Sequence, residues 1–186
     1  SPNILSIPSG FSSPVLAAMR NRICDGTKIY YHYMSESDIW VLDLSGTRVL
    51  ATLPVVPYHY DVGFTYNQEF LFVSLNVGSA TNYETYRIPK NGGAPVLLFS
   101  FLYPAAAVDN QYVYFVQGPL IRRMPVSGGS MSDAFRITEG TVNTLAVEED
   151  AYYWTDNSLG VGLGRIWRHD RNMQWVQATA SAPWGP

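Results

Sequence analysis

The sequence repeats one pattern four times, and each copy is a polar turn followed by a run of aromatic and β-branched residues. The copies are residues 25–32, 66–73, 109–116 and 149–155. Taking Ile29, Phe70, Val113 and Tyr152 as equivalent positions gives steps of 41, 43 and 39 residues. A period of about 40–50 residues built of short strands and turns is typical of β-propeller blades. The repeat therefore predicts an all-β propeller of about four four-stranded antiparallel blades, either a closed ring or part of a larger propeller.

Turn residues place the blades at approximately residues 15–53, 58–100, 104–138 and 142–178. The third strands of the blades are predicted at 38–43, 84–89, 120–125 and 165–170, and they end at turns rich in Gly and Asn, which supply the positive φ that a hairpin needs. The first strand of the first blade is predicted at 16–20, and the outer strand of the last blade at 173–177. Residues 3–8 have the sequence of an outer strand without a blade of their own, so we expect them to complete another blade. Three arrangements satisfy this pattern: a fragment of a longer propeller, a four-bladed ring with an extra edge strand, and a half-ring that associates with a second copy.

Composition removes some classes of function. Apolar residues make up 47% of the 186 residues, and Lys and Arg together number only 12, with a net charge of −3. A protein that grips a phosphate backbone needs clustered cations, so we expect no nucleic-acid partner. No apolar run approaches the roughly 20 residues of a membrane span. Low charge with abundant Tyr, Asn, Ser and Gly points to an extracellular or periplasmic location, and the single Cys24 is expected to be a buried structural thiol.

The fourth repeat carries a family resemblance. Residues 153–156 read Tyr-Trp-Thr-Asp, and they follow an apolar strand and precede a Gly-Arg-Ile segment. This order resembles the YWTD blades of low-density-lipoprotein-receptor-type propellers. The second and third repeats, with their Pro-x-x-Gly-Gly-like turns, resemble blades of bacterial cell-envelope propellers. The resemblance implies a propeller fold, and it implies that Asp156 belongs to the hydrogen-bond framework of the blades.

Residues that could carry catalysis are few. His32, His59 and His169 fall in three different strand contexts, with no companion ligand at metal-binding spacing, so we expect no metal site and no cofactor. Asp25 and Asp109 occupy equivalent turns, which indicates a turn-capping role rather than catalysis. We therefore assign no catalytic residue.

A ligand site is expected where the loops differ between repeats, because a scaffold needs uniform blades and specificity needs unlike groups on rigid supports. The expected rim is formed by the loops entering the first strands and those joining the second strands to the third. The ligand-binding residues predicted there are Tyr58, His59, Tyr103, Asn143 and Asn157. Their rings and amides suit stacking and hydrogen bonding with sugars or peptides.

Three functions are compatible with these features of the sequence. The first is a non-enzymatic recognition module that binds a protein or a carbohydrate at the rim. The second is a propeller enzyme of lyase or lactonase type with a site in the central channel, which the scarcity of histidine and of paired carboxylates disfavours. The third is a multivalent lectin with one site per blade. Association with further blades or with a second copy is expected if the ring is not closed by this chain.

Overall fold

The computed structural model describes residues 20–32, 36–54, 62–78, 82–138, 140–156 and 164–171. Throughout these ranges the regular elements are all β-strands, and they form four antiparallel sheets. The predicted all-β class with four small antiparallel sheets is therefore confirmed. The chain divides into two compact units, residues 1–104 and 105–186, and each unit contains two of the sheets.

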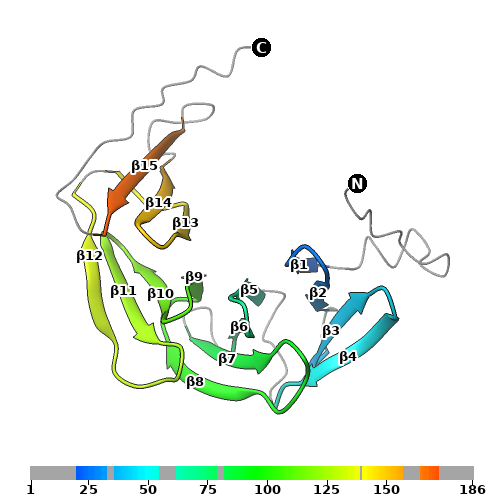
Figure 1. The fold of residues 1–186 in the computed structure, drawn as a ribbon. Coiled ribbons are helices and arrows are strands. Elements are labelled where there is room, and N and C mark those ends of the chain that lie inside the picture. Colours follow the sequence, from blue (N-terminus) through cyan, green and yellow to red (C-terminus); the bar gives the residue numbers. More distant parts are fainter. Residues whose placement is uncertain are drawn as a thin grey trace, which may run out of the picture. The chain divides into compact units, whose positions relative to one another are not determined.

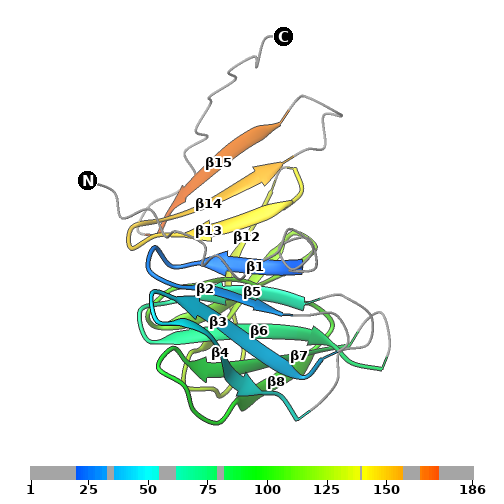
Figure 2. The same ribbon diagram turned by 90° about the vertical axis from the view of Figure 1, so that its right-hand side faces the viewer.

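The first unit holds two sheets of four strands, each arranged as consecutive hairpins (Figure 1). The strands of the first sheet are β1 (Arg20–Cys24), β2 (Ile29–His32), β3 (Asp38–Asp43) and β4 (Gly46–Thr52). Those of the second are β5 (Val62–Tyr66), β6 (Phe70–Asn76), β7 (Tyr83–Pro89) and β8 (Val96–Phe101). The inner strands β1 and β5 lie side by side, as Figure 2 shows.

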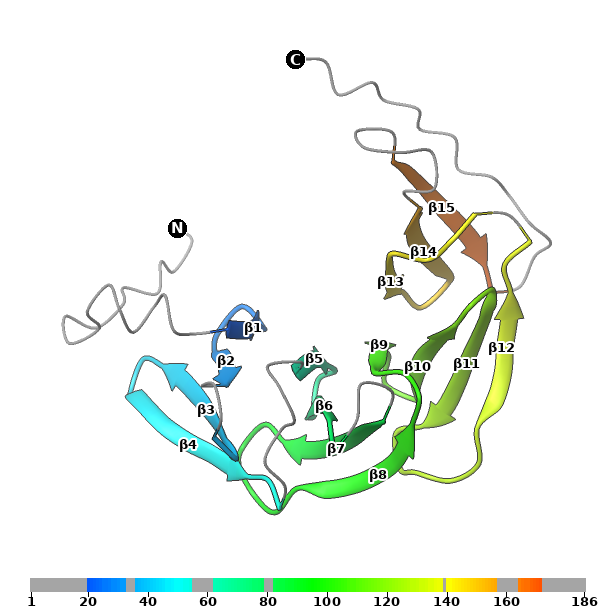
Figure 3. The same ribbon diagram turned by 180° about the vertical axis from the view of Figure 1, so that it is seen from behind.

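The second unit repeats this plan (Figure 3). One sheet contains β9 (Ala105–Val108), β10 (Tyr112–Gln117), β11 (Leu120–Pro125) and β12 (Ser132–Arg136). The other contains β13 (Thr144–Val147), β14 (Ala151–Asp156) and β15 (Arg165–Asp170). The inner strands β9 and β13 are neighbours. The outer strand expected at 173–177 and the extra strand expected at 3–8 lie outside the described residues.

Each unit is held together by an apolar layer between its two sheets. In the first unit this layer includes Tyr30 and Ile39 from one sheet, and Leu71 and Ile88 from the other. In the second unit an aromatic cluster takes its place, in which the indole rings of Trp154 and Trp167 stack 6.1 Å apart. Because side chains alternate across a strand, one face of each strand supplies this layer. Burial of such rings between sheets is what keeps the two sheets of a unit packed together.

Backbone hydrogen bonds define which turn residues are equivalent in the four sheets. The N–H groups of Asp25, Asn67, Asp109 and Glu148 each donate to the carbonyl three residues later, at 2.9–3.1 Å. These positions are 42, 42 and 39 residues apart. The structure therefore corrects the steps of 41 and 43: Leu71, not Phe70, corresponds to Ile29. The sequence-based alignment of the second repeat was one residue out of register. The turn of this repeat begins at Asn67, whereas the sequence pattern starts at Tyr66.

The beginning of the first sheet also differs from the prediction. Its first strand was expected at 16–20, whereas β1 spans Arg20–Cys24 and pairs Cys24 with Ile29 of β2. Cys24 was predicted to be buried, and this was wrong: the thiol is exposed at the mouth of the turn. Its Sγ accepts a hydrogen bond from the N–H of Gly26 at 3.4 Å, so the thiol contacts the polar backbone of the turn and is not part of the apolar layer. In the part of the chain that the structure describes, no helix is long and apolar enough to cross a membrane.

Candidate functional site

Two of the five residues predicted at the rim are described by the structure. Tyr103 belongs to the first unit and Asn143 to the second, and each is exposed. Tyr58, His59 and Asn157 lie outside the described residues. A rim formed by all five residues therefore stays a prediction.

Tyr103 stands at the end of a row of aromatic rings. Its ring centroid is 5.9 Å from that of Phe101, which is in turn 6.4 Å from that of Phe99. Tyr103 is 36% exposed, while the two phenylalanines are half-buried. Sequence reasoning singled out Tyr103 alone. Its neighbours follow the alternating pattern Phe-Ser-Phe-Leu-Tyr, which in a strand places every second ring on the same face.

Asn143 and Asp156 lie at the other candidate loop, where the chain enters β13. The N–H of Asn143 donates to the carbonyl of Thr155 at 2.8 Å, which leaves the exposed amide outside the ladder. Asp156, at the end of β14, is only 1% exposed. Its Oδ1 accepts hydrogen bonds from the N–H and the hydroxyl of Thr141, both at 3.2 Å. Asp156 therefore fixes the loop entering β13 and is not presented to solvent.

The two described histidines, His32 and His169, belong to different units, and each has neighbours within its own unit. His32 is buried, and its Nε2 lies 2.7 Å from the carbonyl of Glu36. His169 is stacked on Phe135 with ring centroids 4.9 Å apart, and burial lowers its pKa. His59 lies outside the described residues. Within the ranges that the structure describes, no three His, Cys, Asp or Glu side chains are grouped so that they could hold a metal ion.

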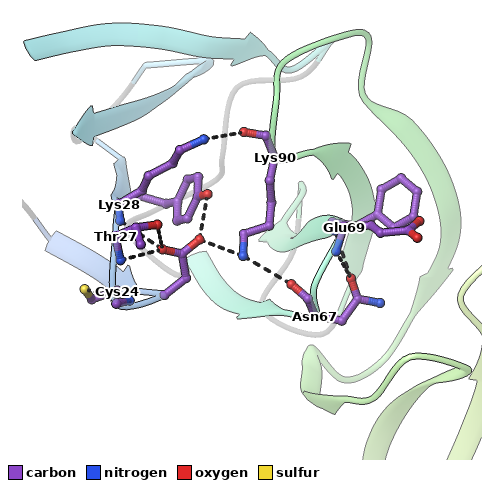
Figure 4. Close-up of polar contacts among 10 residues, drawn as sticks. Cys24, Thr27, Lys28, Asn67, Glu69 and Lys90 are labelled. Atoms are coloured by element: carbon purple, nitrogen blue, oxygen red, sulfur yellow. Dashed lines mark hydrogen bonds and ion pairs between the residues drawn. The ribbon is translucent and has the colours of Figure 1, made fainter. Parts of the chain in front are cut away.

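The turn carboxylate Asp25 joins the two sheets of the first unit. Its Oδ1 accepts hydrogen bonds from the N–H groups of Thr27 and Lys28, at 3.0 and 2.9 Å, which caps the turn as predicted. Its Oδ2 lies 2.6 Å from Nζ of Lys90, which follows β7 in the other sheet. Figure 4 shows the Lys90 side chain reaching this turn, where Nζ also donates to the carbonyl of Asn67 at 3.2 Å.

A tyrosine completes this arrangement. The hydroxyl of Tyr30 donates to Oδ2 of Asp25 at 3.0 Å, and Nζ of Lys90 lies 5.8 Å from the centre of the Tyr30 ring. Burial and the neighbouring carboxylate raise the pKa of Tyr30, so the phenol stays protonated and remains a donor. We call Asp25, Tyr30 and Lys90 the first lock.

The second unit contains the same arrangement. Asp109 caps its turn through the N–H groups of Gln111 and Tyr112, at 2.7 and 2.6 Å. The hydroxyl of Tyr114 donates to Oδ2 of Asp109 at 2.8 Å, and a nitrogen of Arg171 lies 2.7 Å from the same oxygen. Arg171 follows β15, as Lys90 follows β7, and its guanidinium lies 5.9 Å from the centre of the Tyr114 ring. We call Asp109, Tyr114 and Arg171 the second lock. A group repeated in both units has a structural role.

No protein-family model matches the sequence, and no curated protein matches it either. Solved structures do. An oligogalacturonate lyase in complex with manganese aligns with a TM-score of 0.55 and 13% identity, over 78% of this chain and 48% of that one. GH43B of the Bacteroides ovatus xyloglucan PUL aligns with a TM-score of 0.51 and 13% identity, over 89% and 40%. Hsv2p of Kluyveromyces lactis aligns with a TM-score of 0.51 and 12% identity, over 84% and 50%.

These likenesses concern the fold. At such low identities, what the chain shares with these structures is a succession of small antiparallel sheets. Together with the fourfold repeat, this succession shows that the chain is built of β-propeller blades. The chain spans about half the length, or less, of the structures it matches. Because one fold hosts many activities, the fold does not transfer an activity to this chain.

Proposed function

We propose that this chain contributes blades to a carbohydrate-active β-propeller. The observation that carries the proposal is the likeness to two structures whose names refer to carbohydrate chemistry, an oligogalacturonate lyase and a xyloglucan-associated GH43 protein. This favours a propeller enzyme over the recognition module that the sequence alone favours. The likeness to Hsv2p, whose name refers to no carbohydrate, makes a direct test necessary.

The described residues supply sugar-binding chemistry more readily than acid–base chemistry. Tyr103 presents a partly exposed ring with a polar tip, and Asn143 presents an exposed amide, both of which suit sugar hydroxyls and sugar faces. Lyase chemistry needs a base and a group that stabilises a developing negative charge. The predicted rim residue best suited to act as a base is His59, which lies outside the described residues.

The experiment tests the chain for binding and turnover of three oligosaccharides: oligogalacturonate, xyloglucan fragments and a cello-oligosaccharide. Binding is followed by isothermal titration calorimetry. Turnover is followed by the ultraviolet absorbance of an unsaturated uronate product and by a reducing-end assay. Binding of any member supports the proposal, and turnover of oligogalacturonate identifies the lyase. Tyr58→Ala and His59→Ala are expected to weaken binding without unfolding the protein.

A recognition module remains the second candidate, because the only groups described at the rim are an exposed ring and an exposed amide. Stoichiometry separates it from a multivalent lectin, which would bind several sugars per chain. Binding without turnover favours recognition. The absence of any binding or turnover across the panel would contradict the proposed function. The YWTD resemblance and an extracellular or periplasmic location stay predictions.

A further inference from the structure

Exposed apolar side chains are concentrated at the end of the first unit. Of the seven large apolar side chains that are exposed among the described residues, four fall within residues 96–103. They are Val96, Leu97, Leu102 and Tyr103. Exposed apolar side chains that gather in one place, rather than being scattered singly, mark surfaces that bind something.

The rings in this segment share one face. Phe99, Phe101 and Tyr103 alternate along the chain, with centroid separations of 6.4 and 5.9 Å and interplanar angles of 57° and 58°. The half-buried phenylalanines hold the row against the sheet, and Tyr103 extends it past the end of β8. The turn is anchored behind Tyr103, because a Cβ on Gly63 of β5 would lie 3.8 Å from Cβ of Pro104. The last ring is thus carried by a supported turn.

The same segment carries no charge. Between Lys90 and Asp109 the sequence has no charged residue, so β8 has none. The outer strands β4 and β12 differ, since β4 contains Arg48 and β12 contains Asp133 and Arg136. A carboxylate-bearing sugar chain is held by Arg or Lys through charge-assisted hydrogen bonds. The β8 segment offers it no such partner, whereas flat rings favour the C–H face of an uncharged sugar.

We propose that Phe99, Phe101 and Tyr103 form a stacking platform for a neutral, pyranose-based polysaccharide chain. This inference rests on the proposed function and deepens it, because it chooses between neutral and uronate sugars. Each ring is expected to lie under one sugar unit of the chain, with the hydroxyl of Tyr103 available to sugar hydroxyls.

The test measures binding of a xyloglucan oligosaccharide to the whole chain by calorimetry, with Tyr103→Ala, Tyr103→Phe and Leu102→Ala compared. The platform predicts that Tyr103→Ala weakens binding roughly tenfold. Tyr103→Phe should keep most of the affinity, because the ring does the stacking. Leu102→Ala is the matched control: it removes an apolar side chain of the same turn that is more exposed, at 53% against 36%, but is not part of the row of rings, and it should change affinity less than roughly twofold. Circular dichroism checks that all three variants fold.

The outcomes separate the platform from the proposed function. Unchanged affinity of Tyr103→Ala for a bound xyloglucan oligosaccharide overturns the platform and leaves the proposed function standing. Binding of oligogalacturonate alone, weakened by salt, also overturns the platform, since it shows a cationic site elsewhere. Self-association that Leu97→Lys abolishes, without sugar binding, identifies a second copy as the occupant and overturns both. No binding of any sugar, by a chain that remains monomeric, overturns both as well.

Discussion

Lys90 Nζ lies 2.6 Å from Asp25 Oδ2, and this ion pair joins the first residue after β7 to the first turn of the neighbouring sheet. Both side chains are largely removed from water, with exposures of 14% and 7%. The pair is also surrounded by further partners, namely the Tyr30 hydroxyl and two backbone N–H groups of the turn. A buried pair satisfied in this way specifies which loop of one sheet faces which turn of the next.

Removing the cation should therefore destabilise the first unit. Lys90→Met leaves the carboxylate of Asp25 without its ionic partner, and we expect a loss of about 2–3 kcal/mol in the free energy of unfolding. Urea unfolding followed by fluorescence and circular dichroism measures it. Lys28→Met is the control, because it removes one positive charge from the same turn but only a 3.4 Å hydrogen bond to the Lys90 carbonyl. Equal losses in the two variants would show that the pair contributes nothing specific.

The locks should make the protein sensitive to acid. Burial opposes ionisation of Asp25 and Asp109, but hydrogen bonds from the turn and from the cations outweigh it and hold the pKa of each carboxyl below its ordinary value of 3.8. A depressed folded-state pKa gives stability that is present above the unfolded pKa and is lost as the pH falls below it. Asp25→Asn combined with Asp109→Asn should lower stability at neutral pH and flatten its decline toward about pH 3. Unfolding curves at several pH values test this, and an unchanged slope would contradict it.

His169 should produce a second pH dependence at milder acidity. Its ring stacks against Phe135 and Tyr152, at centroid distances of 4.9 and 6.1 Å. Burial lowers its pKa and outweighs the opposing effect of Asp170. The neutral ring is therefore favoured in the folded state, and stability should decline as the pH falls below about 6.5. Substitution of His169 by Phe keeps the stack and should remove this decline. Melting temperatures between about pH 5 and pH 8 check the prediction.

Gly140 should tolerate no side chain. A Cβ there would lie 2.3 Å from Oδ2 of Asp156, and its φ of +77° already strains any L-residue. Gly78 has a similar φ of +73° with nothing within 4 Å, so Gly78→Ala isolates the backbone strain, which costs about 1–2 kcal/mol. We expect Gly140→Ala to cost clearly more, because it also displaces the Asp156 carboxylate. If thermal unfolding shows equal losses, the close approach is not rigid.

The tie between Asp156 and its loop makes a related prediction. Asp156→Ala removes the buried carboxylate and both of its hydrogen bonds from Thr141, so we expect a loss of about 1–3 kcal/mol. Asp156→Asn retains an acceptor of the same shape and should lose less. Denaturant unfolding compares the two variants. A fully stable Asp156→Ala protein would mean that solvent replaces the carboxylate without cost.

Several strands could be predicted from the local sequence, because residues at their ends form recognisable turns. The predicted third strands 38–43, 120–125 and 165–170 agree with β3, β11 and β15, because a turn with its own sequence signal bounds each of them. The end of the first strand was misplaced: it was expected at Arg20, whereas β1 continues to Cys24, and residues 16–19 lie outside the described residues. Local patterns report hairpins well, since the partners of a hairpin are near in sequence.

The locks could not have been found in the same way. Asp25 and Lys90 belong to different sheets, and their approach depends on how those sheets pack, which no local pattern encodes. The candidate site could be predicted only in part. The loop position of Tyr103 indicated an exposed ring, and the alternation of Phe99, Phe101 and Tyr103 was present in the sequence, but their common face became evident only with the boundaries of β8.

The spacing of the locks has a consequence for how sheets could be added or lost. Single sheets recur about every 42 residues, but the carboxylate, tyrosine and cation recur at offsets of 84, 84 and 81, once per pair of sheets. The position after β11 that corresponds to Lys90 and Arg171 is Val126, whose N–H donates to the carbonyl of Gln111 as theirs do to Glu69 and Asp150. Each lock therefore needs a pair of unlike sheets, one bearing the acid and the tyrosine and the other bearing the cation. The loss of one sheet alone would leave an acid without its cation, whereas the loss of such a pair would remove a whole lock.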